Sequence, residues 1–255
     1  MIKEDMLNEI IQGDCLEVMR DIPDGSVDMI LADLPYGTTA CRWDSIIPFE
    51  PLWKQYERII KDNGAIVLTA AQPFTSALVM SNPKIFRYEW IWEKSKATLF
   101  QHANRMPLRG HENVCVFYKR LPTYNPQKVF VGVKDNRKTF SSRLNNNEFT
   151  AGNMVVKTRK DDGWRFPVTV QKFNNSDRTK QLHPTQKPVA LFEYLIRTYT
   201  DEGELVLDNV IGSGTTAVAA IKTGRNFIGI EQELEYVEIA KRRVDEARAE
   251  KEGDS

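Results

Sequence analysis

The sequence predicts an α/β fold: a Rossmann-like, mostly parallel, twisted sheet with helices on both faces, interrupted by an irregular basic insertion. Short apolar runs of strand character alternate with segments of helical periodicity. Two of these alternations form complete strand–helix–strand units, whose strands pair in parallel. Between the two units, residues 120–182 show no sustained periodicity.

Length and composition are those of a globular protein. The chain has 255 residues, of which 41% are hydrophobic and 27% charged, enough for a large α/β domain with an insertion. No apolar run approaches a membrane span, and the N-terminus lacks a signal-peptide layout, so we expect a cytoplasmic protein without a membrane partner. Cys15, Cys41 and Cys115 are odd in number and widely spaced, which predicts reduced thiols and no structural metal.

The first strand–helix–strand unit lies near the N-terminus. Strands are expected at 27–33 and 64–70, and the segment 51–64 between them has one apolar helical face. Gly64 is expected to cap the C-terminus of this helix. The apolar face of this expected helix consists of Leu52, Trp53, Tyr56, Ile59 and Ile60. Further strands are expected at 88–94 and 112–119.

The insertion 120–182 carries the charge asymmetry of the chain. The whole sequence balances 35 basic against 35 acidic residues, but Lys119 to Lys180 holds 14 lysines and arginines against five acidic residues, a net +9. The remainder therefore carries −9. Such a separation favours a local surface for a polyanion, although on charge alone a solvated, irregular basic insertion is an equal alternative.

Regular structure is predicted again from residue 184. A helix over 184–200 begins with proline and places five apolar residues on one side. These are Val189, Phe192, Leu195, Ile196 and Tyr199. A strand at 204–208, a glycine turn and helix at 212–224, a strand at 226–231 and a charged helix from Leu234 complete the second unit.

The second unit contains a nucleotide-type turn. Its first strand ends at Asp208, Gly212 and Gly214 allow a close approach to the backbone, and a helix starting at Thr215 points N–H groups at the same place. The P-loop lysine is missing and the GxGxxG pattern is incomplete, so tight turn packing is an alternative. Glu231 ends the next strand, in the position from which a carboxylate binds both ribose hydroxyls.

The first unit ends in an unusual polar turn. The apolar run 29–32 delivers Asp33, Leu34, Pro35 and Tyr36 to the carboxyl edge of the sheet, where open α/β folds bind ligands. A plain structural interpretation is also available, in which Asp33 caps the turn and Tyr36 packs as a half-buried ring.

These residues resemble the catalytic tetrad of the DNA amino-methyltransferases, which use S-adenosylmethionine to methylate the exocyclic nitrogen of adenine or cytosine. Three more segments are similar to motifs of that family: "DNVIGSGTT" to the cofactor motif, "FIGIEQE" to the ribose-binding strand, and "HPTQKPVALFEYLI" to the helix that clasps the methionine part. With the tetrad first and the cofactor motif last, the order is similar to the permuted beta group. Matching motifs cover most of the chain outside 120–180.

Two motifs depart from the family pattern. Leu34 replaces the proline of Asp-Pro-Pro-Tyr, and Asn209 and Val210 replace the Pro-Phe of the cofactor motif. In the family the second tetrad residue acts through its backbone carbonyl, which leucine keeps, so the resemblance still implies catalysis.

The resemblance implies a class I methyltransferase domain, circularly permuted, formed by 1–119 and 183–255, with 120–182 as an inserted DNA target-recognition region. It implies Asp33, Leu34, Pro35 and Tyr36 as catalytic residues. The implied residues for S-adenosylmethionine, and its product S-adenosylhomocysteine, are Asp14, Cys15, Asp33, Thr185, Lys187, Asp208, Gly212, Ser213, Gly214, Thr215, Thr216, Glu231 and Gln232. The expected DNA contacts are Arg42, Trp43, Arg137, Lys138, Arg143, Lys157, Arg159, Lys160 and Arg165.

The implied chemistry concerns an exocyclic amine. Acceptance of its two hydrogens by the Asp33 carboxylate and the Leu34 carbonyl would favour a nucleophilic nitrogen, and Tyr36 would stack on the base. The base must be flipped out of double-stranded DNA, which is the expected partner. Relatives are often homodimers, and the oligomeric state stays open, as do the recognition sequence and any cognate restriction enzyme.

Several alternatives remain. N4-cytosine methylation involves the same amine problem, although Asp33 resembles the adenine branch and serine is more usual in the cytosine branch. C5-cytosine methylation needs a Pro-Cys pair that is missing. RNA or protein-glutamine methylation normally has Asn in the first tetrad position. An NAD-dependent oxidoreductase would need the third glycine of GxGxxG, and a catalytically silent DNA-binding relative would not need the intact tetrad.

Overall fold

The computed structural model describes residues 2–3, 5–37, 44–132, 162–175 and 186–253. Within it the chain divides into two compact units. The first comprises residues 1–125 and 169–255, and the second comprises residues 126–168.

The first unit contains an eight-stranded sheet. Five of these strands, β1, β10, β9, β2 and β3, are parallel to one another. Strand β5 is antiparallel to both β3 and β4, and β8 pairs with β4 in parallel. The predicted mostly parallel sheet is thus confirmed. In spatial order the strands are β1 (Glu9–Gln12), β10 (Asn226–Glu231), β9 (Leu205–Asp208), β2 (Val27–Ala32), β3 (Ile60–Ala70), β5 (Arg109–Phe117), β4 (Phe86–Thr98) and β8 (Val170–Phe173).

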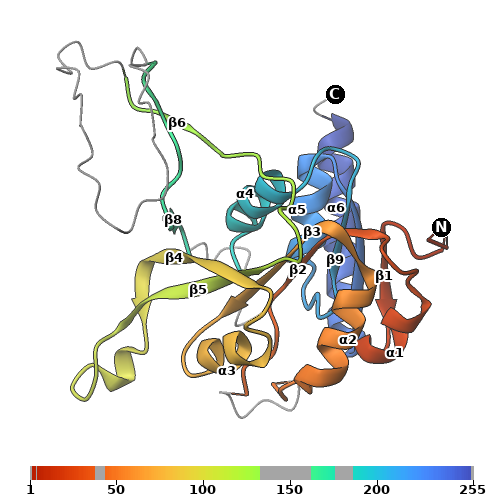
Figure 1. Cartoon of the computed structure of the whole chain (residues 1–255), viewed down its shortest axis with the longest axis horizontal. Coiled ribbons are helices and arrows are strands. Elements are labelled where there is room, and N and C mark those ends of the chain that lie inside the picture. The colour runs from red at the N-terminus through yellow and green to blue at the C-terminus, as the bar shows by residue number, and fades with distance from the viewer. Residues whose placement is uncertain (1, 4, 38–43, 133–161, 176–185, 254–255) are drawn as a thin grey trace, which may run out of the picture. The chain divides into compact units, whose positions relative to one another are not determined.

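Helices cover both faces of this sheet (Figure 1). On one face lie α4 (Val189–Tyr199), α5 (Thr215–Thr223) and α6 (Leu234–Gly253). On the other lie α1 (Cys15–Val18), the 3₁₀ turn η1 (Met19–Asp21), α2 (Phe49–Ile59) and α3 (Phe74–Ser81). Each face of the sheet has its own hydrophobic core, and alternate residues of β2 point into the two cores. Met29 and Leu31 lie in the core under α4, α5 and α6, while Ile30 lies in the core under α2 and α3. A strand covered on both faces is expected to be apolar, and β2 is so except at Asp28, which accepts hydrogen bonds from Lys61 Nζ and from the Leu205 N–H.

The second unit contains a short antiparallel pair, β6 (Val129–Phe130) and β7 (Trp164–Arg165). The rings of Phe130 and Trp164 lie 5.3 Å apart between centroids. Strand β8, although within the stretch expected to be inserted, joins the sheet of the first unit.

The expected helix cap at Gly64 is wrong. Helix α2 ends at Ile59, and Ile60 already begins β3. Gly64 lies where the pairing of β2 with β3 shifts register, and a Cβ there would come within 2.7 Å of the Asp28 carbonyl. The glycine is needed for a close backbone approach in a β-bulge, which resembles a helix stop in local sequence.

Helix α4 also begins later than expected. Residues 186–188 are not helical, and the first helical residue is Val189. Pro188 disfavours the helical conformation for the residue before it, which agrees with Lys187 lying outside the helix. This keeps the Lys187 side chain at the start of the helix rather than on its surface.

Candidate active site

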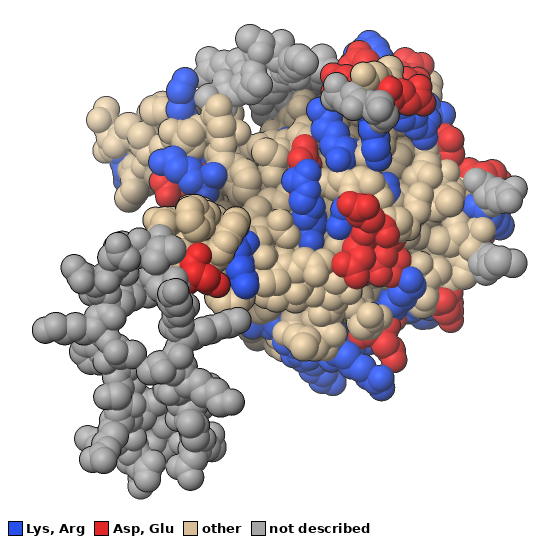
Figure 2. Space-filling model, turned by 90° about the horizontal axis from the view of Figure 1, so that it is seen from above, with Lys and Arg blue, Asp and Glu red and all other residues tan. Residues whose placement is uncertain are grey.

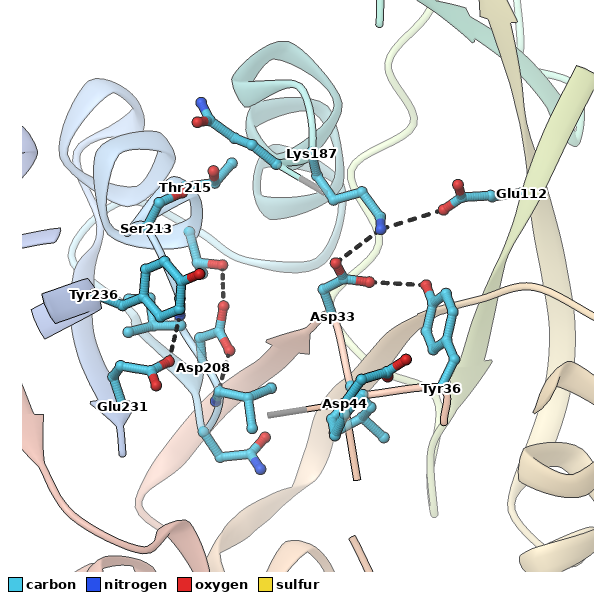
Figure 3. A pocket seen from close by; sticks show the side chains of 18 of the residues that line it. Asp33, Tyr36, Asp44, Glu112, Lys187, Asp208, Ser213, Thr215, Glu231 and Tyr236 are labelled. Carbon is cyan, nitrogen blue, oxygen red and sulfur yellow. Dashed lines mark hydrogen bonds and ion pairs between the residues drawn. The ribbon is translucent and has the colours of Figure 1, made fainter. Parts of the chain in front are cut away.

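A cavity of about 950 Å³ opens at the carboxyl ends of the parallel strands (Figure 3). Asp33 follows β2, Asp208 ends β9 and Glu231 ends β10, so three carboxylates meet at one edge of the sheet. The volume lies near the upper end of the roughly 300–1,000 Å³ typical of ligand pockets. Predicted residues that line it are Asp14, Cys15, Asp33, Leu34, Pro35, Tyr36, Lys187, Asp208, Gly212, Ser213, Thr215, Thr216, Glu231 and Gln232.

The Asp33 carboxylate is held by three donors. Its Oδ1 accepts hydrogen bonds from the Tyr36 hydroxyl at 2.8 Å and from the Thr69 hydroxyl. Its Oδ2 accepts one from Lys187 Nζ at 2.8 Å. A carboxylate offers about four lone-pair positions, so these donors leave room on Oδ2 for one further hydrogen. The carboxylate is thereby fixed in orientation and still able to accept from a ligand.

Lys187 links Asp33 to a second buried carboxylate. Its Nζ lies 3.3 Å from Glu112 Oε2, and Glu112 Oε1 lies 2.5 Å from Lys94 Nζ. Only 7% of each lysine side chain and 12% of the Glu112 side chain are exposed. Figure 3 shows Lys187 between the two carboxylates. Among the described residues Glu112 Oε2 has no well-aligned hydrogen bond, so the attraction of charges holds it.

The ionisation of this cluster follows from its charges. Burial favours the neutral amine of Lys187, but the carboxylates of Asp33 and Glu112 outweigh burial and raise its pKa. Burial likewise favours neutral Glu112, but Lys187 and Lys94 outweigh it and lower its pKa. Lys187 and Glu112 are therefore both charged at neutral pH.

Tyr36 presents a neutral phenol beside this cluster. Burial raises its pKa well above the ordinary value, and the charges of Asp33 and Glu112 add to the effect. One neighbour of its ring is Phe74, stacked at 5.1 Å with an interplanar angle of 25°. Lys187 Nζ lies 5.4 Å from the ring centroid. The Leu34 side chain is 3% exposed and packs in the core between the sheet and α2.

The glycine turn has the backbone that its sequence predicted. Gly212 and Gly214 have positive φ values of 52° and 87°, and α5 begins directly afterwards at Thr215. Gly214 is not part of the cavity lining, and a Cβ at this position would lie 3.0 Å from the Ala240 side chain. Its role is close packing of the turn against α6.

The strand-end acids Asp208 and Glu231 have different partners. Asp208 is held by the turn: it accepts hydrogen bonds from Val210 N at 3.1 Å and from the Thr216 hydroxyl. Glu231 accepts the Gly212 N–H through Oε2 and the Glu233 N–H through Oε1, each at 2.9 Å. Each Glu231 oxygen keeps a lone pair, so the carboxylate fits a diol such as a ribose.

Burial also shifts the pKa values of these two acids. It raises the pKa of Asp208 to about 7 and raises that of Glu231.

Asp14 and Cys15 lie at the next strand end. The Asp14 carboxylate caps α1 by accepting the Leu16 N–H at 2.8 Å, and Gly13 N–H donates to the Glu231 carbonyl at 2.9 Å. Burial raises the pKa of the half-buried Cys15 thiol, which is therefore neutral. The expected cofactor residues of β1 and β10 thus lie side by side.

Several site residues were not predicted from the sequence. They are Thr69 on Asp33, the pair Lys94 and Glu112, and Arg243 of α6, whose Nη1 donates to the Ser213 carbonyl at 2.5 Å. Both residues of the pair fall on segments expected to be strands, 88–94 and 112–119, but other charged residues on the same strands leave no signal that singles them out. No local signal marks Arg243, which lies among many charged residues of α6.

Some predicted residues lie outside the described ones. They are Thr185, Arg42, Trp43, Arg137, Lys138, Arg143, Lys157, Arg159 and Lys160. Arg165 belongs to β7 in the second unit, and its Nη1 donates to the Trp164 carbonyl at 2.9 Å. On the face shown in Figure 2, basic and acidic side chains of the described residues are interspersed.

The described residues contain no group of three or more His, Cys, Asp or Glu that could hold a metal ion. Within the same part of the chain, no helix has the length and apolar character required to cross a bilayer.

Comparison with known proteins agrees with this geometry. The chain is 31% identical to the type II methyltransferase M2.MboI of Moraxella bovis, over 93% of this chain and 87% of that protein. It is 28% identical to the type II methyltransferase M.HinfI of Haemophilus influenzae, over 97% of this chain and 72% of that protein.

Solved structures share the fold. The M1.HpyAVI–SAM complex matches with a TM-score of 0.63 at 24% identity, covering 92% of this chain and 98% of that chain. The cytosine-N4-specific PvuII DNA methyltransferase matches with a TM-score of 0.64 at 18% identity, covering 92% and 85%. The sequence profile of the DNA methylase family matches residues 27–242. The chain therefore belongs to the N6/N4 DNA methylase family, whose members take their methyl group from S-adenosylmethionine.

Proposed function

We propose that the chain methylates the N6 amine of adenine in a specific site of double-stranded DNA. The observation that carries the proposal is the Asp33 carboxylate, which three donors orient and which keeps one accepting position on Oδ2. It lies in the same cavity as the glycine turn and Glu231. S-adenosylmethionine would supply an electrophilic methyl group there.

The residues of the cavity fit this cofactor. The α5 N-terminus and Gly212, which lines the cavity, suit close contact with a polar ligand, and both Glu231 oxygens retain a lone pair for a ribose hydroxyl. Lys187 donates to Asp33 and faces Glu112, which leaves one of its three N–H groups for the methionine carboxylate. The cavity is also large enough for a second ligand group beside the cofactor.

The chain would activate the amine by hydrogen bonding. The free position on Asp33 Oδ2 accepts one amine hydrogen and the Leu34 carbonyl accepts the other, which directs the nitrogen lone pair away from the ring. The bound cofactor would supply the methyl group to this nitrogen, and the amine would release one proton, for which Asp33 Oδ2 is the adjacent acceptor. The Tyr36 ring holds the plane of the base.

Lys187 and Glu112 would keep Asp33 ready for this role. The Lys187 ammonium stabilises the ionised carboxylate, and Glu112 holds the ammonium from the opposite side. Without Lys187, Asp33 Oδ2 would lose the donor that fixes its direction toward the amine. We infer that the ion pairs orient the Asp33 carboxylate.

The DNA substrate would be bound partly by residues 120–182. Nine of the 14 basic residues between Lys119 and Lys180 lie outside the described residues, and the proposal for this region rests on charge and on its position in the permuted order. The named relatives come from bacteria. We therefore expect the enzyme to act in the cytoplasm of a bacterial or phage-infected cell, as a monomer or homodimer.

N4-cytosine methylation is the second candidate, since the PvuII enzyme, with this fold, is cytosine-N4-specific. Adenine is favoured by the aspartate in the first tetrad position. The test is to express the chain in a methylation-free host and to identify modified bases directly in its DNA, with Asp33→Ala as the control. N6-methyladenine at one recurring sequence is expected. N4-methylcytosine would overturn the choice of base, and unmodified DNA would overturn the activity.

A further inference from the structure

The tip of the β4–β5 hairpin, residues 96–109, is exposed, apolar and basic. Phe100 is 65% exposed, Met106 48% and Leu108 36%. The segment contains Lys96, Arg105 and Arg109, and no acidic residue. Exposed apolar side chains together with charge of a single sign are typical of a surface that binds a partner.

This tip borders the candidate active site. Lys96, Leu99, Phe100 and Arg109 line the same cavity as Asp33 and Tyr36. In Figure 1, β4 and β5 run out of the body of the first unit and end in the projecting 3₁₀ turn η2 (Phe100–His102). A partner whose reacting group enters the cavity would therefore meet the hairpin tip.

The tip is preformed by its own hydrogen bonds. The N–H of His102 donates to Leu99 O at 2.9 Å, and the N–H of Arg105 donates to His102 O at 2.8 Å. Leu99 has a φ of 68°, in the left-handed region that costs a branched residue free energy. The turn keeps this conformation and presents Phe100 outward beside the cavity.

We propose that this hairpin tip is a second DNA-contacting element, distinct from residues 120–182, that enters the duplex beside the extruded base. Phe100 occupies the gap left in the base stack, and Lys96 and Arg105 contact the flanking phosphates. The inference rests on the proposed function, because a flipped base leaves a gap that an apolar side chain can fill. Basic side chains on both sides of such a wedge complement the phosphate backbone.

A second copy of the chain is the competing occupant. A two-fold contact centred on this tip would place its basic residues against the same residues of the other copy, where like charges repel. DNA carries the opposite charge, and a base flipped into the cavity would bring the duplex next to the tip. The charge thus favours DNA over a dimer contact.

The test uses the full chain and fragmented genomic DNA from a methylation-free host. The rate of labelled methyl incorporation from S-adenosylmethionine is measured over DNA concentration and over salt. Phe100→Ala should lower kcat/KM for DNA about tenfold, since a stacked aromatic contributes a factor of this order per base. Lys96→Gln with Arg105→Gln should reduce the slope of log KM against log salt by about 2.

Matched controls separate these effects from those of removing any exposed apolar side chain or any exposed charge. Met80→Ala removes another exposed apolar side chain, and Lys241→Gln another exposed charge, and neither residue lines the cavity. Both should behave as the wild type. All variants should bind S-adenosylhomocysteine with unchanged affinity and unfold at the wild-type temperature, which shows that the fold and the cofactor site are intact.

Each other outcome has a definite meaning. If the wild type incorporates methyl groups and the hairpin variants match it in kcat/KM and salt slope, the hairpin proposal is wrong while the proposed function stands. Variants that change the molecular mass in solution but not the DNA parameters would make the tip an interface between copies and overturn the proposal. A wild type that labels no DNA would overturn the proposed function itself.

Discussion

Lys187 Nζ lies 2.8 Å from Asp33 Oδ2, although the two residues are 154 positions apart in the sequence. The contact joins the segment before α4 to the end of β2, and so unites two sequence motifs in one charge cluster. We expect Lys187→Met to reduce kcat about 100-fold or more, because an interaction with a partly buried charge is worth roughly 3 kcal/mol. Steady-state kinetics at saturating cofactor would measure it, and wild-type kcat in the variant would refute the role.

The pH dependence of this cluster follows from the directions of its pKa shifts. The raised pKa of Lys187 stabilises the fold below the unfolded value of about 10.4 and the contribution is lost as pH rises through the folded pKa. The lowered pKa of Glu112 stabilises above about pH 4.3 and is lost as pH falls through its folded pKa. Glu112→Gln removes one of the two carboxylates that raise the Lys187 pKa. The alkaline limb of the kcat–pH profile should therefore move to lower pH.

Glu89→Gln is the matched control for this prediction. Glu89 lies on β4 and accepts a hydrogen bond from Asn113 at 2.8 Å, but it does not line the cavity. Its variant should keep the wild-type profile. An alkaline limb that moves equally in both variants, or in neither, would contradict a specific role of Glu112.

The two hydroxyls on Asp33 Oδ1 can be separated by substitution. Tyr36→Phe removes one donor and keeps the ring, while Thr69→Val removes the other donor. Each loss of a hydrogen bond to a charged group should cost about 1.5–3 kcal/mol, or about 10- to 100-fold in kcat. Tyr36→Ala should cost more, because the stacking ring is lost as well. Equal rates for Tyr36→Phe and Tyr36→Ala would contradict stacking on the base.

Local sequence patterns predicted the glycine turn and the strand-end acids of this site. The residues that reach the site from β3 and β5 depend on the order and direction of the strands. The glycine turn and the start of α5 at Thr215 follow from residues that adjoin in sequence. Glu112 reaches the site because β5 is antiparallel to β3, which places the start of β5 at the carboxyl end of β3. Periodicity does not specify which strands are neighbours or their direction, so Glu112 and Thr69 could be assigned to strands but not to the site.

Glu231 should govern cofactor affinity rather than the chemical step. Its carboxylate is anchored by two backbone N–H groups and keeps a lone pair on each oxygen. Glu231→Gln replaces one accepting oxygen with a donor, so we expect binding of S-adenosylhomocysteine to weaken about 10-fold or more. Calorimetric titration measures the affinity. At saturating cofactor kcat should change little, and a large fall in kcat with unchanged affinity would contradict this role.

Asp208 should make stability depend on pH in the opposite sense to Glu112. Burial raises its pKa to about 7, so between about pH 4 and 7 the folded state binds more protons than the unfolded state, and stability falls as pH rises. The shift corresponds to an upper bound of about 4 kcal/mol. Asp208→Asn removes this titration and can still accept the Val210 N–H. Urea unfolding at pH 4.5 and 7.5 should show a smaller loss of stability in the variant than in the wild type.

Substitutions of Leu34 test whether the second tetrad residue acts through its backbone alone. Its side chain is 3% exposed in the core that α2 covers, so leucine has a packing role there that proline fills only in part. Proline would also restrict Asp33 to extended conformations, which suits a residue leaving a strand. We expect Leu34→Pro to keep kcat within about threefold of wild type and to lower the free energy of unfolding by about 1–2 kcal/mol, the scale of a partly lost apolar contact. Leu34→Ala, with its larger cavity, should cost more stability at similar kcat. An inactive Leu34→Pro variant that unfolds at the wild-type temperature would show that the leucine side chain, or the N–H that proline lacks, takes part in catalysis.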